Sequence, residues 1–272
     1  MPIDRRLLLN LDWATLVATL LLGAISVATI ASATQGTRFA GLYLKQAGVF
    51  GAGLVALVVL LSLDYRRLAD RAPLFYLAAV ALLAYALLFG PRVAGTKRWF
   101  FVAGLQVKHS ELAKLAAALL LAKIFAEMRR DSLGLADVLV PGAAVGGLAL
   151  LIAAAPDLGT AFCLVPLFLA VALLAGLRPR AVVTLFLALA LVGGLGWKFA
   201  LKDYQKERIY TFLDPQRDPR GTGYQKIQSQ IAVGSGGLLG VSLGQSTQKL
   251  FFLPFAHTDF IFAIIGEEAG LV

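Results

Sequence analysis

The chain has 272 residues, of which 59% are apolar and only 15% are charged, and its mean hydropathy of +0.79 lies far above that of a soluble domain. This composition excludes an intrinsically disordered chain, and a single cysteine excludes a disulfide scaffold. The formal net charge of +9 favours an anionic partner, such as phosphate, lipid headgroups or nucleic acid.

Long apolar runs, each a candidate membrane helix, follow one another along the chain. A helix needs about 20 apolar residues to cross a hydrocarbon core of roughly 30 Å. The runs that meet or approach this length are 11–33, 46–63, 72–90, 110–126, 135–155, 158–177 and 181–200. A further run, 258–272, is too short to cross, so we expect the sequence to stop inside a membrane helix.

The runs predict an all-α polytopic membrane protein, built as a transmembrane bundle of seven to eight helices. We expect residues 1–272 to form a single integral membrane domain that is incomplete at its C-terminus. Within it, residues 201–256 are expected to form a large extracytoplasmic loop.

The loop charges indicate the orientation. A cytoplasmic N-terminus places ten lysines and arginines inside and six in the short outer loops, as the positive-inside rule favours. The cations that remain outside are explained by a bound anion or, alternatively, by scattered surface charge. Nucleic acid is excluded as a partner, because the cations are scattered among membrane helices and no recognised binding module is present.

Two outer segments combine cations with other polar groups. The first holds Lys97 and Arg98 beside aromatic residues, and it is typical of either an anion site or an interfacial anchor. The second opens the fourth run with Ser110 as the expected N-cap. There Glu111 and Lys114 share a helix face and can pair, either within a functional site or as an interfacial ion pair.

Two further outer segments carry aspartates. Asp157 opens the sixth run, where capping of the helix N-terminus is the simplest role. His257, Thr258 and Asp259 open the last apolar run. The carboxylate of Asp259 is expected in the first turn of that helix, as a helix-end charge or as a general base for a hydroxyl that arrives from the outer face. His109 and His257 lie too far apart to make a metal signature.

The segment between these aspartates is rich in glycine. Residues 234–240 do not form a Walker A loop, because no Gly-Lys-Ser/Thr closes them, and we expect a flexible turn within a re-entrant loop. Glu267 and Glu268 follow in the last apolar run. At that depth their carboxylates must be paired, protonated or directed to a wet cavity.

Taken together, these motifs resemble the SEDS family (shape, elongation, division and sporulation), whose members include RodA and FtsW. The resemblance follows the family's order through Gly-Thr-Lys-Arg-Trp at 95–99, Ser-Glu-Leu-Ala-Lys-Leu at 110–115, Pro-Asp-Leu-Gly-Thr at 156–160, Glu-Arg-Ile at 207–209, Gly-Tyr-Gln at 223–225, Gln-Ser at 228–229, Gly-Ser-Gly-Gly-Leu at 234–238, His-Thr-Asp-Phe-Ile-Phe at 257–262 and Gly-Glu-Glu at 266–268. The short segment before the first run is more similar to the RodA branch. One departure precedes the fourth run, where Lys108-His109 stands in place of the usual Gln-Pro.

The resemblance implies about ten membrane helices and a peptidoglycan glycosyltransferase. Such an enzyme polymerises lipid II into glycan strands by inverting transfer from an undecaprenyl-pyrophosphate donor, and the RodA branch does so in cell elongation and shape. It works on the outer face of the bacterial cytoplasmic membrane, among membrane lipids, with a class B penicillin-binding protein, which is a transpeptidase. By resemblance Asp259 is the catalytic carboxylate, Glu111 and Lys114 are the family's Glu–Lys pair, and Asp157 is its Pro-Asp-Leu-Gly aspartate.

The remaining site residues follow from the same chemistry. The departing diphosphate needs cations, for which Lys97, Arg98, Lys114 and Arg208 are candidates. The residues expected to bind substrate are Lys97, Arg98, Glu111, Lys114, Asp157, Arg208, Gln228, Ser229, His257 and Thr258. The motifs require no cofactor, and a divalent cation, Mg²⁺ or Mn²⁺, is the one candidate. Two other functions stay open: a lipid II flippase and a non-catalytic scaffold for a penicillin-binding protein.

Overall fold

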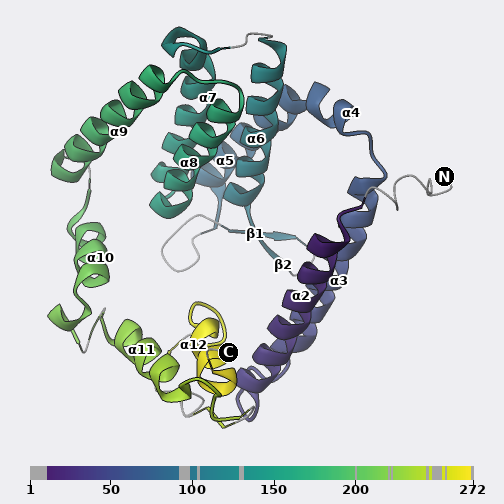
Figure 1. The fold of residues 1–272 in the computed structure, drawn as a ribbon, viewed down its shortest axis with the longest axis vertical. Coiled ribbons are helices and arrows are strands. Elements are labelled where there is room, and N and C mark those ends of the chain that lie inside the picture. Colours follow the sequence, from purple (N-terminus) through teal and green to yellow (C-terminus); the bar gives the residue numbers. More distant parts are fainter. Residues whose placement is uncertain are drawn as a thin grey trace. The chain divides into compact units, whose positions relative to one another are not determined.

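The computed structural model describes residues 11–91, 99–102, 105–128, 132–199, 201–219, 221, 223–242, 245–246, 253–254 and 256–270 (Figure 1). The chain divides into two compact units. The first joins Met1–Ser62 to Gly196–Val272, and the second is Leu63–Leu195. Each unit has its own helices and its own share of the predicted site.

The first unit begins with two apolar helices, α2 (Trp13–Thr34) and α3 (Leu42–Leu61), which pack on each other. Asp12 caps α2, because its carboxylate accepts hydrogen bonds from two backbone N–H groups of the first turn. Gly23 allows α3 to approach closely, since a Cβ at this position would lie 2.1 Å from the ring of Phe50.

The C-terminal part of this unit consists of short helices: α10 (Asp203–Leu213), the 3₁₀ helix η1 (Pro215–Arg217), α11 (Tyr224–Gly236) and α12 (Ile261–Ala269). α11 packs on α12, around a small core of Ala232, Leu253 and Ala263. α12 also contacts α2, so the last apolar run of the sequence is tied to the first. The segment expected as an extracytoplasmic loop thus contains helices, and its side of the membrane stays a prediction.

The second unit holds the larger core. Its elements are α4 (Tyr65–Asp70), α5 (Ala72–Phe89), β1 (Trp99–Val102), β2 (Leu105–Lys108), α6 (His109–Glu127), α7 (Leu135–Ala154), α8 (Leu158–Leu174) and most of α9 (Pro179–Phe199). α5 packs on α6, α7 on α8, and α6 on α8. Leu121, Leu148, Ile152 and Leu164 are fully buried between these helices, and alanines on α6 allow the close packing.

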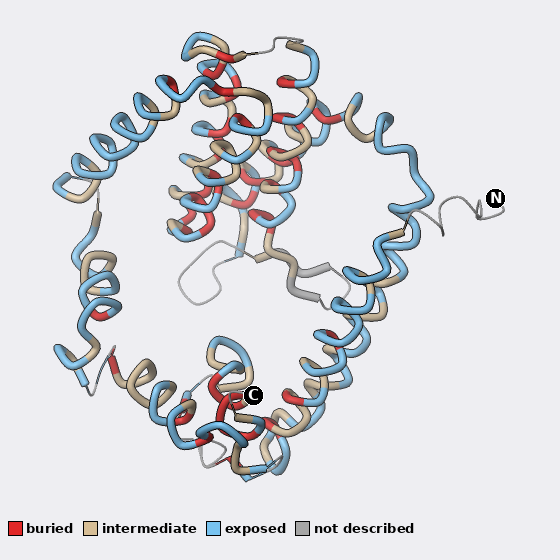
Figure 2. Tube along the Cα trace, in the orientation of Figure 1, coloured by how far each residue is buried: buried red, intermediate tan, exposed pale blue. Residues whose placement is uncertain are grey.

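Every predicted run contains a helix, which confirms the all-α membrane fold. Among the described residues, five helices are long and apolar enough to cross a membrane: α2, α3, α5, α7 and α9. α8 is shorter, and α6 carries four charged residues. α3 has no buried residue and α9 has only one, so both are exposed along most of their length (Figure 2). Because both helices are apolar, this exposure is expected of helices that face lipid.

One element was not predicted. The segment that was expected to lie at the interface contains an antiparallel hairpin of β1 and β2, in which Trp99 pairs with Lys108 and Val102 with Leu105. β2 ends at Lys108, and α6 begins at the next residue, His109. The hairpin therefore fixes where Lys108 stands relative to the start of α6.

Candidate functional site

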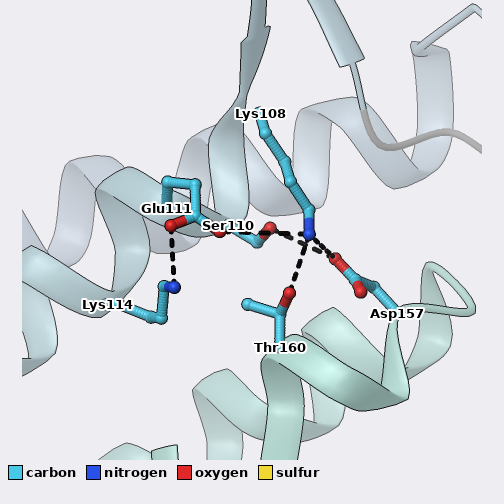
Figure 3. A network of polar contacts seen from close by, with 6 residues as sticks. All are labelled: Lys108, Ser110, Glu111, Lys114, Asp157 and Thr160. Carbon is cyan, nitrogen blue, oxygen red and sulfur yellow. Dashed lines mark hydrogen bonds and ion pairs between the residues drawn. The ribbon is translucent and has the colours of Figure 1, made fainter. Parts of the chain in front are cut away.

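A polar cluster lies where α6 and α8 begin, within the second unit (Figure 3). Glu111 is in the first turn of α6, and its Oε2 is 2.7 Å from Nζ of Lys114, three residues on. This contact confirms the pairing that the spacing predicted. The side chain of Glu111 is 53% exposed and that of Lys114 is 30% exposed, so the pair lies at the edge of the cluster.

Lys108 forms the centre of the cluster. Its Nζ is 2.8 Å from Oδ2 of Asp157 and 2.8 Å from Oγ1 of Thr160, both at the start of α8. The same ammonium is 3.9 Å from Oε1 of Glu111. One lysine thus contacts carboxylates from two helices, and Figure 3 shows these side chains converging on its tip.

Asp157 does not act as the helix cap that its position suggested. It stands at the N-cap of α8, but its side chain makes no capping hydrogen bond there. Instead its Oδ2 is bound by Lys108 and lies 3.3 Å from the hydroxyl of Ser110. Because the aspartate is buried, the ion pair compensates the loss of water around its charge.

Ser110 was also misjudged as an N-cap. α6 begins one residue earlier, at His109, and Lys108 occupies the N-cap position with extended backbone. Ser110 is fully buried and uses its hydroxyl for Asp157. At Asp157 a partner on another element replaced the local backbone donor, whereas at Ser110 the helix had already begun before the serine.

Sequence reasoning missed Lys108 and Thr160 as site residues. Thr160 is within a motif that was noted, but no role was given to it. Lys108 was noted as one of the six cations of the short outer loops and as a departure from the family pattern, but it was given no role in the site. A signal was available for the lysine, because it stands three residues before Glu111, a spacing at which opposite charges meet on one helix face. Its contact with Asp157, 49 positions along the chain, could not be read from spacing.

The second aspartate of the predicted site lies in the first unit. Asp259 is in the turn that precedes α12, and it is exposed. The helix starts at Ile261 with Phe260 at its N-cap, so Asp259 is outside the first turn in which it was expected. Its carboxylate has no hydrogen bond or ion pair with any other described residue.

The neighbours of Asp259 are placed by packing. The imidazole of His257 stacks on the ring of Phe39, with centroids 4.9 Å apart, and Phe39 in turn carries the guanidinium of Arg38 over its ring. Thr258 is exposed. The turn is thereby attached to the segment between α2 and α3 by aromatic contacts.

The glycine-rich segment ends α11, turns at residues 237–239 and packs against α12. A Cβ at Gly236 would lie 2.0 Å from the carbonyl oxygen of Gly266, and one at Gly240 would lie 2.2 Å from that of Glu268. Gly240 also has a positive φ of +74°, which a side chain disfavours. The N–H of Val241 donates to the carbonyl of Glu267 at 2.9 Å. Gly236 and Gly240 are therefore required for close backbone contact with α12.

The two glutamates of α12 are buried and have polar partners. The hydroxyl of Ser32, on α2, lies 2.9 Å from each carboxylate oxygen of Glu268. The hydroxyl of Ser246 donates to Glu267. The sequence predicted that these carboxylates would be paired, protonated or directed to a wet cavity. The structure shows the first arrangement, with hydroxyl groups as the partners.

The other predicted residues are only partly gathered. Arg208 is exposed on α10, and Gln228 and Ser229 are half-buried on α11, which packs on α12. Lys97 and Arg98 lie outside the described residues. No group of three or more histidine, cysteine, aspartate or glutamate side chains with the geometry of a metal site occurs in the part of the chain that the structure describes.

Comparisons with known proteins agree with this architecture. The family model of the cell cycle proteins FtsW, RodA and SpoVE matches residues 8–272. The peptidoglycan glycosyltransferase MrdB of Escherichia coli strain K12 is 35% identical over 270 residues, which cover 97% of this chain and 70% of MrdB.

Two solved structures are similar as well. One is a chain of a peptidoglycan synthase complex that coordinates polymerization and crosslinking, with a TM-score of 0.77 and 31% identity over 97% of this chain and 72% of that chain. The other is the rod shape determining protein RodA of Thermus thermophilus, with a TM-score of 0.57 and 31% identity over 68% of this chain and 60% of that chain.

Proposed function

We propose that this chain, which belongs to the FtsW, RodA and SpoVE family, polymerises lipid II into glycan strands by inverting transfer from an undecaprenyl-pyrophosphate donor. The chain is a multi-pass membrane protein and a peptidoglycan glycosyltransferase of that family. The observation that carries the proposal is the exposed carboxylate of Asp259, which has no partner among the described residues.

Asp259 is assigned the role of general base. The 4-hydroxyl of the lipid II GlcNAc attacks the anomeric carbon of the growing strand, and the carboxylate takes the hydroxyl proton as that bond forms. The bond from the anomeric carbon to the diphosphate oxygen breaks, and undecaprenyl pyrophosphate leaves with the electron pair. Because this is a single displacement, the anomeric configuration inverts.

The departing diphosphate is assigned to cationic side chains. Lys114 is the described candidate in the polar cluster, because its partner Glu111 is half-exposed. Arg208 is exposed on α10, and Lys97 and Arg98 stay candidates outside the described residues. Charge on the leaving group is neutralised best by such preorganised donors. Gln228, Ser229, His257 and Thr258 stay proposed substrate contacts.

The two carboxylates of the polar cluster, Glu111 and Asp157, do not fit a divalent-cation site. Glu111 and Asp157, which approach the same point, are both already in contact with lysine ammonium groups, and an ammonium repels a metal ion from the oxygens it binds. No step of the proposed reaction therefore passes through Mg²⁺ or Mn²⁺.

A class B penicillin-binding protein is the proposed partner, which would crosslink the strands that this chain makes. The support is the similarity to a chain of a peptidoglycan synthase complex that coordinates polymerization and crosslinking. The proposed reaction takes place on the outer face of the bacterial cytoplasmic membrane, with the N-terminus in the cytoplasm, and the loop charges support this orientation.

The test is polymerisation of labelled lipid II by the natural full-length protein and its partner, with the partner's own active site blocked. Wild type is expected to make glycan chains, and Asp259→Ala none. An absence of chains from folded wild type would favour the flippase or scaffold functions and reject the enzyme proposed here. Asp203→Asn, an exposed aspartate on α10, is the matched control and should polymerise like wild type.

The cellular role proposed is elongation and shape, as in the RodA branch. Similarity to the rod shape determining protein of Thermus thermophilus supports this role. The gene should restore rod shape to a bacterium depleted of its elongation glycosyltransferase. Rescue of septum formation in a division mutant, without rescue of rod shape, would assign the chain to division instead.

A further inference from the structure

Lys108 and Lys114 belong to one cluster but have different surroundings. The ammonium of Lys108 is directed at protein atoms on α8, namely Oδ2 of Asp157 and Oγ1 of Thr160, each at 2.8 Å. Among the described residues, the ammonium of Lys114 has one partner, Glu111, at 2.7 Å. The side chain of Asp157 is 8% exposed, whereas that of Glu111 is 53% exposed.

The difference in exposure between the two carboxylates determines which lysine can exchange its carboxylate partner for a substrate anion. An ion pair at the edge of solvent is weak, so an incoming anion displaces Glu111 from Lys114 at little cost. The pair of Lys108 and Asp157 behaves differently, because removing the lysine takes the ammonium away from a carboxylate that is shielded from water. Moving Lys108 toward a substrate would leave Asp157 in that condition.

The connections of Lys108 also join two helices. It ends β2 and occupies the N-cap of α6, while both of its close contacts stand in the first residues of α8. Ser110 adds a second contact from α6 to the same carboxylate oxygen, at 3.3 Å. The starts of α6 and α8 are therefore held together through the charge of Asp157.

We propose that Lys108 is a positioning residue that acts through Asp157: it neutralises this buried carboxylate and fixes the start of α6, and hence Lys114, against the start of α8. Lys108 does not contact the diphosphate, and Lys114 does. The inference rests on the proposed function, because it divides the roles of two lysines within the transfer reaction.

A double-mutant cycle tests the connection between Lys108 and Asp157. Lys108→Met takes the ammonium away from the buried carboxylate of Asp157, and Asp157→Asn takes the nearest carboxylate away from Lys108, so each is expected to lower turnover by at least ~10-fold. The double variant contains neither charge and should be at least ~5-fold more active than either single variant. Lys108→Arg keeps the charge and should retain most of the activity. A double variant no more active than Asp157→Asn would overturn the proposal.

Pyrophosphate binding separates positioning from substrate contact. Inorganic pyrophosphate is added to each variant, and binding is read from the rise in Tm that it causes. Lys114→Met should weaken this binding by ~10-fold, and Lys108→Met should leave it within about twofold of wild type. Equal weakening in both variants would show that Lys108 also contacts the anion, and would reject the division of roles.

The double-mutant cycle can also be measured through thermal stability, which does not depend on catalytic activity. If wild type made no glycan, the proposed function would fail, but the Tm values of the four proteins would still report the pair. Both single variants should unfold several degrees below wild type, and the double variant should recover at least half of that loss. Additive Tm losses would overturn the coupling whatever the activity.

Discussion

Asp157 and Asp259 both precede a helix, yet their environments are opposite. Asp157 is buried at the start of α8, where Lys108 and Ser110 bind its carboxylate. Asp259 is exposed in the turn before α12 and has no side-chain partner among the described residues. A carboxylate whose bonds are all made within the protein can position its neighbours, whereas an unpartnered one can accept a proton from a substrate.

The supports of the two regions differ as well. The start of α8 is held by charge, through an ion pair that reaches across to β2. α12 is held by close backbone contact with the glycines of α11 and the segment that follows it. We therefore expect charge removal to damage the first region and added side-chain atoms to damage the second.

The largest effect is expected at Asp259. Asp259→Asn keeps the shape of the side chain but removes the base, so the polymerisation rate should fall by ~10² to 10⁴. Tm should stay unchanged, because the carboxylate is exposed and contacts no polar group in the part of the chain that the structure describes. Asp203→Asn on α10 is the control for loss of an exposed aspartate. A fall in Tm that matched the loss of activity would make Asp259 a structural residue and remove the contrast with Asp157.

The next effect concerns the backbone contact beneath α12. Gly236→Ala places a Cβ 2.0 Å from the carbonyl oxygen of Gly266 and 2.8 Å from Cα of Glu267. Because the atoms it meets are backbone, the free energy of unfolding should fall by about 3 kcal/mol, the upper end for overpacking. Denaturant titration in detergent measures this change.

Gly234→Ala is the matched control for that variant. It is on the same helix, α11, and its Cβ would meet no described atom within 4 Å. The free energy of unfolding should change by less than about 1 kcal/mol, and a small gain is expected because alanine loses less entropy in a helix. Equal losses at both positions would show that the contact with Gly266 is not what constrains the segment.

The sequence predicted the helix spans better than it predicted the contacts of the site. Helix spans were found well, because apolar runs set them: the run 72–90 corresponds to Ala72–Phe89, and 135–155 to Leu135–Ala154. α3 begins at Leu42, four residues before the start of the predicted run. The predicted run starts late because it excludes Lys45, a charged residue that belongs to the first turn of the helix. Amphipathic lysine stems are tolerated at such helix ends.

Within the site, predictions held where a contact was local. The Glu111–Lys114 pair followed from its spacing along one helix. The roles given to Asp157 and Ser110 failed, because helix capping is a local rule and the partner they found instead is on another element. The close contact of Gly236 with Gly266 was equally invisible, because it depends on how α11 meets α12.

A smaller effect is expected at Ser110. Ser110→Ala removes a hydrogen bond to Asp157 that, at 3.3 Å, is longer than the 2.8 Å contact of Lys108, and it leaves Lys108 in place. The free energy of unfolding should fall by about 1 kcal/mol, less than for loss of the Lys108 charge that neutralises the buried Asp157. Ser62→Ala at the exposed end of α3 is the control for losing a hydroxyl and should have almost no effect. A loss at Ser110 as large as at Lys108 would mean that charge is not the main support of this region.

The smallest effect on stability is expected at the edge of the cluster, where α6 offers its own control. Glu111 pairs with Lys114 at 2.7 Å near the start of the helix, and Glu127 pairs with Lys123 at 3.6 Å near its end. Both glutamates are more than half exposed, so Glu111→Gln and Glu127→Gln should each change the free energy of unfolding by less than ~0.5 kcal/mol. Polymerisation assays should nevertheless separate them, because only Glu111 belongs to the proposed site: its variant should slow turnover several-fold, while Glu127→Gln should not. Equal turnover in the two variants would show that the Glu111–Lys114 pair is only a surface contact. The polar cluster at the starts of α6 and α8 would then act through Lys108 and Asp157 alone.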